Sequence, residues 1–276
     1  LENMYTETKL SFLPEDATGD VMYIDDELQG EKETVKASKV LDLFRTNPNQ
    51  HVKIETWNNM PTAAGLSSSS SGLSALVKAA NELFQVGKTQ SELAQIAKFA
   101  SGSSSRSFFG PLAAWDKDSG EVYQVETDLK LAMIMLVLTD QKKPVSSRDG
   151  MKLCTETSTS FPEWIKQSEQ DYKDMLGYLK ANDFQAVGEL TEANALRMHQ
   201  TTSTANPPFS YLTDASYQAM DKVKALRASG EQCYFTMDAG PNVKVLCLEE
   251  DLDRLAEHFR KDYQVIVSRT KELPDA

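Results

Sequence analysis

The sequence predicts an α+β protein with two domains, and three observations point to this fold class. Strand-like segments are grouped in the first half, helical segments follow, and the chain ends in a strand–helix–strand pattern. Such segregated runs of strands and helices are typical of α+β domains. The length of 276 residues is enough for one or two domains. Because a polar segment, residues 140–149, separates the two patterns, we expect domains at residues 1–140 and 141–276.

The first predicted domain combines strands with helices. Alternation of apolar and polar residues predicts its strands at residues 4–12, 21–24, 27–29, 51–57, 121–125 and 130–139. Apolar residues at helical spacing predict its helices at residues 31–44, 73–84 and 89–100. Gly87 stands where a C-terminal helix cap belongs, and Thr89 with Glu92 has the spacing of a capping box.

The second predicted domain is richer in helices. Helical spacing predicts them at residues 150–156, 161–181, 184–199, 213–229 and 250–259. Strands are expected at residues 233–238, 243–247 and 264–269.

Composition limits the kind of protein. The chain is 40% hydrophobic and 25% charged, which is typical of a globular protein. Its net charge of −12 argues against nucleic acid or an anionic membrane as a partner. The longest apolar run, residues 131–138, is too short to cross a bilayer, and the first residues lack the pattern of a signal peptide. Three widely spaced cysteines (Cys154, Cys233 and Cys247) favour a reducing, cytoplasmic location over disulfides or a zinc site.

A run of small residues between a predicted strand and a predicted helix is the strongest candidate binding site. Small side chains let the backbone approach a polyphosphate, and a helix start directs N–H groups and the positive end of its dipole towards an anion. The candidate residues are Pro61, Ala63, Ala64, Gly65, Leu66, Ser67, Ser68, Ser69 and Ser70. The hydroxyls of Ser68 and Ser69 suit phosphate oxygens or a Mg²⁺ ion. A helix cap without a ligand is the alternative, but a cap needs one serine and a serine run forms helix poorly, so we favour phosphate binding.

A second candidate segment places hydroxyls beside an arginine. Residues 101–107 form an expected loop that contains Ser101, Ser103 and Arg106. A guanidinium in this setting suits bidentate binding of a carboxylate or a phosphate. A surface loop with a solvated arginine would have the same sequence, so both interpretations stay open.

The second predicted domain offers two further candidates. Ser147, Arg148 and Met151 lie at a predicted helix start, where an N-cap beside a surface charge is the favoured interpretation from these residues alone. Asp238 ends an apolar strand, and its carboxylate could be a catalytic base or stabilise charge. The residues that follow it would also make an ordinary turn. The three histidines, among them His199, share no motif, and we expect packing or surface roles for them.

Together these segments resemble one protein family. The run Asn58-Asn59-Met60-Pro61-Thr62-Ala63-Ala64-Gly65-Leu66-Ser67-Ser68-Ser69 resembles the phosphate loop of the GHMP superfamily, which contains galactokinase, homoserine kinase, mevalonate kinase and phosphomevalonate kinase. Its Pro-Thr-Ala-Ala-Gly-Leu form is similar to that of the diphosphomevalonate decarboxylase family of bacterial type. Residues 100–107, 147–151 and 237–242 also resemble this family and occur in its order.

The resemblance implies a fold and an activity. The implied GHMP-kinase-like fold has a first domain like domain 2 of ribosomal protein S5, a ferredoxin-like second domain and substrates in the cleft between them. The implied reaction is the ATP- and Mg²⁺-dependent conversion of mevalonate 5-diphosphate to isopentenyl diphosphate, ADP, phosphate and CO₂, in the mevalonate pathway. Family members are commonly homodimers, so the resemblance implies a homodimer here.

The resemblance also implies roles for the candidate residues. Asp238 would act on the 3-hydroxyl of the substrate, and Arg106 would hold the carboxylate that leaves as CO₂. Further substrate contacts would come from Ser101, Ser103, Ser147, Arg148 and Met151. Ser68 and Ser69 would bind the ATP phosphates and the metal ion.

The sequence departs from the family in one respect. Family members open with a strand carrying an Ala-Asn-Ile-Ala-like run and a Lys-Tyr-Trp-Gly-Lys-like motif, whose tyrosine and lysine contact the substrate; no such motif occurs in these 276 residues. We therefore expect impaired or absent turnover from these residues alone, although not from the protein they come from.

Two other functions stay open. One is a kinase of the same superfamily that phosphorylates mevalonate, phosphomevalonate or homoserine and stops there. Such kinases usually have a Gly-Leu-Gly-Ser-Ser-type loop, whereas Ser67 follows Leu66 here. The other is a non-catalytic ATP-binding relative, against which the presence of both Asp238 and Arg106 argues.

Overall fold

The computed structural model describes residues 1–59, 68–139 and 144–273. Contacts within the chain divide these residues into two compact units. The first unit contains residues 4–59, 68–124 and 271–273, and the second contains residues 1–3, 125–139 and 144–270.

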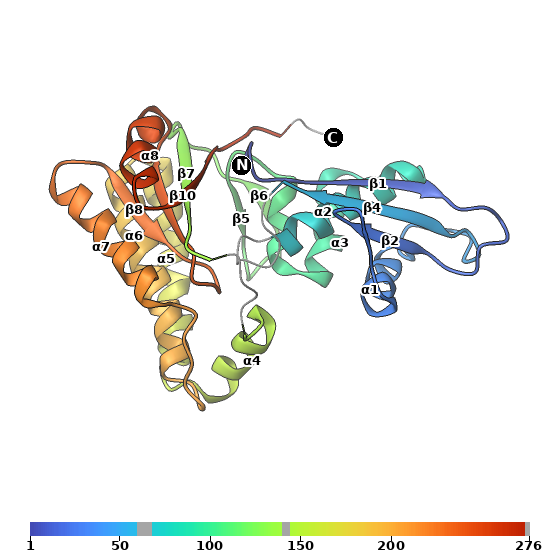
Figure 1. Ribbon diagram of the computed structural model, residues 1–276, viewed down its shortest axis with the longest axis horizontal. Coiled ribbons are helices and arrows are strands. Elements are labelled where there is room, and N and C mark those ends of the chain that lie inside the picture. Colours follow the sequence, from blue (N-terminus) through green and yellow to red (C-terminus); the bar gives the residue numbers. More distant parts are fainter. Residues whose placement is uncertain (60–67, 140–143, 274–276) are drawn as a thin grey trace. The chain divides into compact units, whose positions relative to one another are not determined.

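The first unit contains a four-stranded sheet with the order β1-β4-β2-β3. Its strands are β1 (Thr6–Phe12), β2 (Val21–Ile24), β3 (Glu27–Leu28) and β4 (Val52–Asn58). β1 is antiparallel to β4, whereas β2 runs parallel to it (Figure 1). β2 and β3 form the predicted hairpin, because Asp25 and Asp26 adopt the positive φ angles, 50° and 66°, that a two-residue turn requires.

Helices cover this sheet. The described helices of the first unit are α1 (Glu31–Leu41), α2 (Ser68–Leu83), α3 (Gln90–Ala100) and the 3-10 helix η1 (Gly102–Phe108). A small hairpin of β5 (Ala113–Trp115) and β6 (Val122–Gln124) follows η1. The predicted capping box of Thr89 and Glu92 is confirmed at the start of α3. Leu41, Ile54 and Phe108 belong to the buried core that joins the sheet to the helices.

The second unit is built on a four-stranded antiparallel sheet with the order β10-β7-β9-β8. Its strands are β7 (Leu131–Val137), β8 (Cys233–Thr236), β9 (Val243–Leu248) and β10 (Gln264–Arg269). Its helices are α4 (Ser147–Thr157), α5 (Phe161–Lys180), α6 (Phe184–Ser203), α7 (Asp214–Ala228), the short η2 (Glu249–Asp251) and α8 (Leu252–Arg260).

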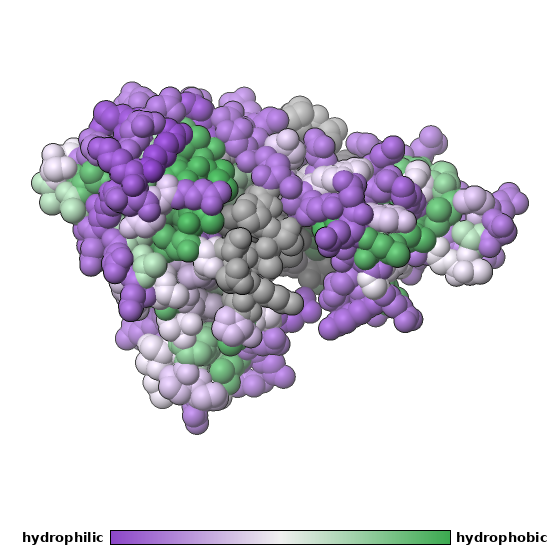
Figure 2. Space-filling model, viewed as in Figure 1, coloured by the Kyte–Doolittle hydropathy of each residue, from purple (hydrophilic) through white to green (hydrophobic). Residues whose placement is uncertain are grey.

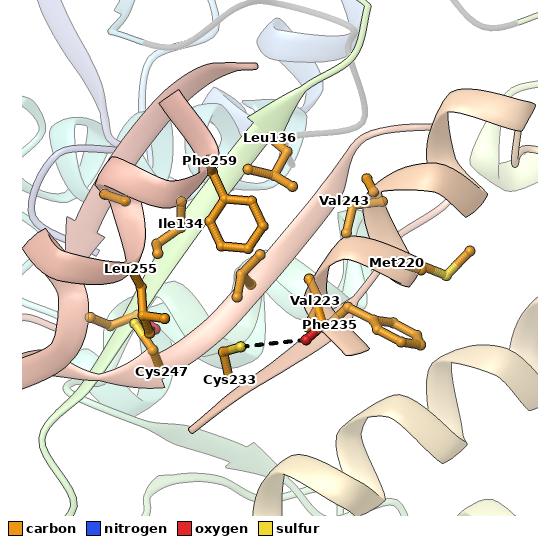
Figure 3. Packing of buried hydrophobic residues seen from close by; sticks show 14 of the residues in the cluster. Ile134, Leu136, Met220, Val223, Cys233, Phe235, Val243, Cys247, Leu255 and Phe259 are labelled. Carbon is orange, nitrogen blue, oxygen red and sulfur yellow. Dashed lines mark hydrogen bonds between the residues drawn. The ribbon is translucent and has the colours of Figure 1, made fainter. Parts of the chain in front are cut away.

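The two faces of the second sheet carry different helices. Figure 3 shows side chains of the strands, such as Ile134 and Phe235, packed with Val223 of α7 and Phe259 of α8. α6 packs on the other face, where Gly188 lies so close to the ring of Tyr234 that a β-carbon would collide with it. The outer face of α8 is polar, and this hydrophilic surface is visible in Figure 2.

The structure differs from the sequence expectations at three places. The two units divide between residues 124 and 125, so β7 lies in the second unit and not in the first, where the boundary at residue 140 put it. The physical reason is that β7 pairs with both β9 and β10. Residues 102–108, expected as a loop, form η1, and the short strand β5 was not predicted.

In the ranges that the structure describes, no helix combines the length and the apolar character needed to cross a bilayer.

Candidate functional site

The first unit brings the start of α2 together with the serine-rich 3-10 helix η1. The predicted phosphate-binding residues Pro61, Ala63, Ala64, Gly65, Leu66 and Ser67 lie outside the described residues, as do the side chains of Ser68 and Ser69. The hydroxyls of Ser70 and Ser103 lie 2.5 Å apart. The hydroxyl of Ser74, one turn further along α2, lies 2.9 Å from the carbonyl oxygens of Ser70 and Ser104. Two segments that the sequence singled out separately therefore meet at the first turn of α2.

The start of α2 has the character of an anion site. α2 is a 16-residue helix that begins at Ser68, and its first turn contains no acidic residue. Its first N–H groups and its dipole therefore face no carboxylate of that turn. Serine hydroxyls add oxygen atoms that can bind Mg²⁺ and O–H groups that can donate hydrogen bonds to phosphate. These donors fit a polyphosphate with a hard divalent cation.

η1 holds Ser101, Ser103 and Arg106 close together. The hydroxyls of Ser101 and Ser103 lie 3.1 Å apart, and the side chains of Ser103 and Arg106 are exposed. Gly102 lies against Trp115, because a β-carbon at this position would stand 2.6 Å from its ring. η1 buries Ser104, Ser105 and Phe108, while Ser103 and Arg106 stay exposed and Ser101 precedes its first turn.

In the second unit, Asp238 lies on a loop that is fixed at several points. The N–H of Gly240 donates to the carbonyl oxygen of Asp238 at 2.8 Å. The buried Asn242 carboxamide accepts from the N–H groups of Leu138 at 2.7 Å and Thr139 at 3.1 Å, and donates to the carbonyl oxygen of Thr139 at 3.0 Å. These bonds tie the loop to the end of β7.

The same loop is held from α7 as well. The buried hydroxyl of Ser216 donates to the carbonyl oxygen of Pro241 at 2.6 Å. The side chain of Asp238 is nevertheless 50% exposed. A rigid loop thus presents a carboxylate to solvent, as a positioned base or charge stabiliser requires.

Lys244 of β9 forms an ion pair with Asp238. Its ammonium donates to Oδ2 of the carboxylate, and its side chain is only 12% exposed. The sequence analysis missed this residue, because the pair depends on how β8 and β9 are aligned. Asp238 comes two positions after Thr236, which stands opposite Lys244 in the β8–β9 ladder.

His199 of α6 lies behind the Asp238 loop. It is buried, and within the described residues neither ring nitrogen has a hydrogen-bond partner. Burial lowers the pKa of His199, although the backbone of Met237 and Asp238 and the Asp238 carboxylate act in the opposite direction. The imidazole is therefore neutral and packs against the loop, which agrees with the packing role expected from the sequence.

Ser147, Arg148 and Met151 lie in the first turns of α4. Ser146 caps this helix, since its hydroxyl accepts the N–H of Asp149 at 3.1 Å, and the three candidate side chains are exposed. Met151 follows Ser147 by four positions and Arg148 by three, so they share one side of the helix.

Tyr211 connects α4 to His199. Its hydroxyl donates to the carbonyl oxygen of Ser146 at 3.0 Å, and its ring meets the imidazole of His199 edge-on at 6.3 Å between ring centres. Burial raises the pKa of Tyr211 to about 12, which keeps the phenol a neutral donor. A chain of contacts thus joins the start of α4 to the Asp238 loop within the second unit.

Comparison with known proteins decides the family. Residues 1–125 match the model of the diphosphomevalonate decarboxylase-like N-terminal domain, and residues 133–274 match that of the mevalonate 5-diphosphate decarboxylase C-terminal domain. The chain belongs to the diphosphomevalonate decarboxylase family. The resemblance found in the sequence motifs is thereby confirmed.

Solved structures of this family confirm the fold. Mevalonate pyrophosphate decarboxylase from Streptococcus pyogenes is 67% identical, with a TM-score of 0.96 over 100% of this chain and 87% of that chain. A structure of MDDEF in complex with MVAPP, AMPPCP and magnesium is 38% identical, with a TM-score of 0.87 over 98% of this chain and 88% of that one. The expected α+β, GHMP-kinase-like two-domain fold is therefore confirmed.

A curated relative gives the same family at lower identity. Diphosphomevalonate decarboxylase from Candida albicans is 32% identical over 216 residues, which cover 75% of this chain and 60% of that protein. The chain thus spans about three fifths of the length of this relative.

Proposed function

We propose that this protein catalyses the ATP-dependent decarboxylation of (R)-mevalonate 5-diphosphate to isopentenyl diphosphate, with release of ADP, phosphate and CO₂. The match of residues 1–125 and 133–274 to both domains of the decarboxylase family carries the proposal. The 67% identity to a protein named mevalonate pyrophosphate decarboxylase supports it. The function belongs to the mevalonate pathway of isoprenoid biosynthesis.

ATP and Mg²⁺ are the proposed cosubstrate and cofactor. The MDDEF structure, with AMPPCP and magnesium, supports this assignment, as does the carboxylate-free first turn of α2. We assign the ATP phosphates to the loop and helix start formed by Pro61, Ala63, Ala64, Gly65, Leu66, Ser67, Ser68, Ser69 and Ser70, in which every residue except Pro61 has a backbone N–H to donate. Ser68 and Ser69 would hold the cation, which neutralises charge on the transferring phosphoryl group.

Asp238 has the central role in the first chemical step. The 3-hydroxyl of the substrate is a tertiary alcohol and a weak nucleophile, so its proton must be accepted or its developing charge stabilised as it attacks the γ-phosphorus of ATP. The exposed carboxylate of Asp238 on its anchored loop is suited to this task. The step forms the O–P bond of a 3-phosphate and releases ADP.

Arg106 has the central role in the second step. The C3–O bond breaks, phosphate leaves with the electron pair, and positive charge develops on C3. The bond to the carboxylate then supplies its electron pair to form the alkene, and CO₂ leaves. A guanidinium that holds the carboxylate fixes the orientation of this bond. Arg106 is exposed on η1 beside Ser101 and Ser103, which we assign to the diphosphate group.

The remaining assignments concern substrate contacts, assembly and location. Ser147, Arg148 and Met151 contact the substrate from the exposed side of α4. The first domain binds ATP, and the second is of the decarboxylase type. The protein is a cytoplasmic homodimer with no nucleic acid or membrane partner; its three buried, free cysteines suit a reducing compartment.

Acceptor specificity tests this proposal against a kinase of the same superfamily. Formation of ADP is followed with Mg²⁺-ATP and, in parallel reactions, mevalonate 5-diphosphate, mevalonate, phosphomevalonate or homoserine. The proposal predicts turnover with mevalonate 5-diphosphate alone, with isopentenyl diphosphate as the organic product. Turnover with another acceptor, without CO₂, would establish a kinase. Nucleotide binding without any ADP formation would indicate a non-catalytic relative.

A further inference from the structure

Lys244 is placed to control the carboxylate that the proposed reaction depends on. We infer that Lys244 is a positioning residue, whose ammonium holds the Asp238 carboxylate in one orientation. The functional part of this inference rests on the proposed function, whereas the ion pair itself does not.

Strand geometry places the lysine. Side chains alternate between the two faces of a strand. Val243, Val245 and Cys247 of β9 point into the core on the α7 and α8 side, so Lys244 points to the other face. Thr236 stands opposite it in the ladder, and the chain leaves β8 just after this residue. Asp238 therefore comes back to the ammonium of Lys244 at the end of the sheet.

The burial of its lysine distinguishes the Asp238–Lys244 pair from the Asp221–Lys224 pair. Lys244 is 12% exposed, whereas Lys224 of α7, paired with Asp221, is 54% exposed. Removing an ammonium from water is costly unless an anion accepts its hydrogen bonds. A lysine at this position thus requires a carboxylate partner, and Asp238 supplies one.

The backbone of the Asp238 loop and the carboxylate of Asp238 are held by different contacts. Asn242, Ser216 and the N–H of Gly240 hold the loop through groups other than Lys244. Loss of the lysine would therefore leave the loop in place and remove the hydrogen bond that the ammonium donates to the carboxylate. The hydrogen bond from Lys244 to Oδ2 restrains the orientation of the Asp238 carboxylate. The Asp238 side chain stays 50% exposed, so the carboxylate remains accessible to a substrate. A carboxylate held in one orientation positions the 3-hydroxyl of the substrate by accepting its hydrogen bond.

Chemical labelling tests the pair without any need for turnover. The acetylation rate of Lys244 by acetic anhydride is measured by peptide mass spectrometry in the unmodified protein and in Asp238→Asn. We expect a rate about fivefold higher in the variant, because the ammonium loses its charged partner. Lys152, whose side chain is 74% exposed, serves as the internal reference and should react equally in both proteins. Equal Lys244 rates would overturn the inference.

Kinetics of Lys244 variants test whether the ion pair with Asp238 affects turnover. Lys244→Met should lower kcat about 10- to 100-fold, with the dissociation constants of both substrates unchanged, because only the orientation of the carboxylate is lost. Lys244→Arg keeps the charge and should retain most of kcat, whereas Lys244→Gln keeps a donor without charge and should behave like Met. Thermal unfolding of each variant excludes a folding defect, and Lys224→Met is the matched control with unchanged kcat.

The outcomes keep the two proposals apart. A normal kcat in Lys244→Met, or weaker substrate binding with kcat unchanged, would overturn the positioning role. Absence of CO₂ release from the unmodified protein would contradict the proposed function, and the labelling result would then decide the ion pair by itself.

Discussion

The Asp238 loop of the second unit and the Ser101–Arg106 segment of the first unit hold their functional groups in different ways. Asp238 has a charged partner in Lys244, on a loop tied down by buried Asn242. Ser103, in contrast, shares hydrogen bonds with other hydroxyls, those of Ser70 and Ser101. A hydroxyl both donates and accepts, so such a pair can reorient towards a phosphate, whereas a carboxylate held by an ammonium cannot turn freely. The comparison suggests a fixed group for the chemical step and adaptable groups for anion binding.

The largest expected effect is that of replacing the fixed carboxylate. Asp238→Asn should lower kcat about 10²- to 10⁴-fold, because the amide neither accepts the proton nor stabilises positive charge. The affinity for ATP should stay unchanged. Steady-state turnover and nucleotide titration check both statements. A residual kcat close to that of the unmodified protein would remove Asp238 from the mechanism.

Replacement of Arg106 should have the next largest effect. Arg106→Met should lower kcat/KM about 10- to 100-fold, which corresponds to the loss of a charge-assisted contact to the substrate carboxylate. Arg106→Lys should recover only part of this loss, since an ammonium lacks the bidentate geometry. Full activity in Arg106→Met would show that the guanidinium is merely solvated.

Stability measurements test the comparison directly. Asn242→Ala should lower the free energy of unfolding by about 2–3 kcal/mol, because the N–H groups of Leu138 and Thr139 lose their acceptor. Ser103→Ala is the matched change in the Ser101–Arg106 segment. It should change the free energy of unfolding by less than about 0.5 kcal/mol, since the side chain of Ser103 is exposed. Urea unfolding of both variants gives the two values. Equal losses of unfolding free energy in the two variants would contradict the difference between the anchored Asp238 loop and the Ser101–Arg106 segment.

The smallest expected effect concerns the pH dependence of stability. Burial lowers the pKa of His199 below its usual 6.5, so the unfolded chain takes up a proton at a higher pH than the folded one. The free energy of unfolding therefore falls as the pH drops below about 6.5, by at most ~1.4 kcal/mol per pH unit, and is unaffected above it. His199→Phe should remove this slope. His51 and His258 stay in both proteins, so their contributions cancel in the difference between the two unfolding curves.

Much of the fold could be predicted from local sequence signals. The hairpin at Asp25-Asp26, the capping box at Thr89 and the strand–helix–strand ending all depend on residues close in sequence. The position of β7 could not be predicted, because its partners β9 and β10 lie more than a hundred residues further along the chain. Segment 101–107 was expected as a loop because it consists mainly of small residues, yet the i to i+3 bonds of residues 102–108 suit a 3-10 helix.

The candidate site shows the same limit. Asp238, Arg106 and the serines could be singled out because they stand in short motifs. Lys244 could not, since no sequence signal distinguishes it from a surface lysine and only the β8–β9 register brings it to Asp238. The neighbourhood of His199 and Tyr211 likewise depends on how α6 packs behind the loop.

The central claim, that phosphorylation and decarboxylation occur in one reaction, is tested most directly by a single-turnover experiment. Excess protein is mixed with Mg²⁺-ATP and mevalonate 5-diphosphate labelled in its carboxylate, and ADP and labelled CO₂ are measured in the same samples. Our account predicts one CO₂ for each ADP, with ADP formed no later than CO₂. ADP formed without CO₂ would contradict the account.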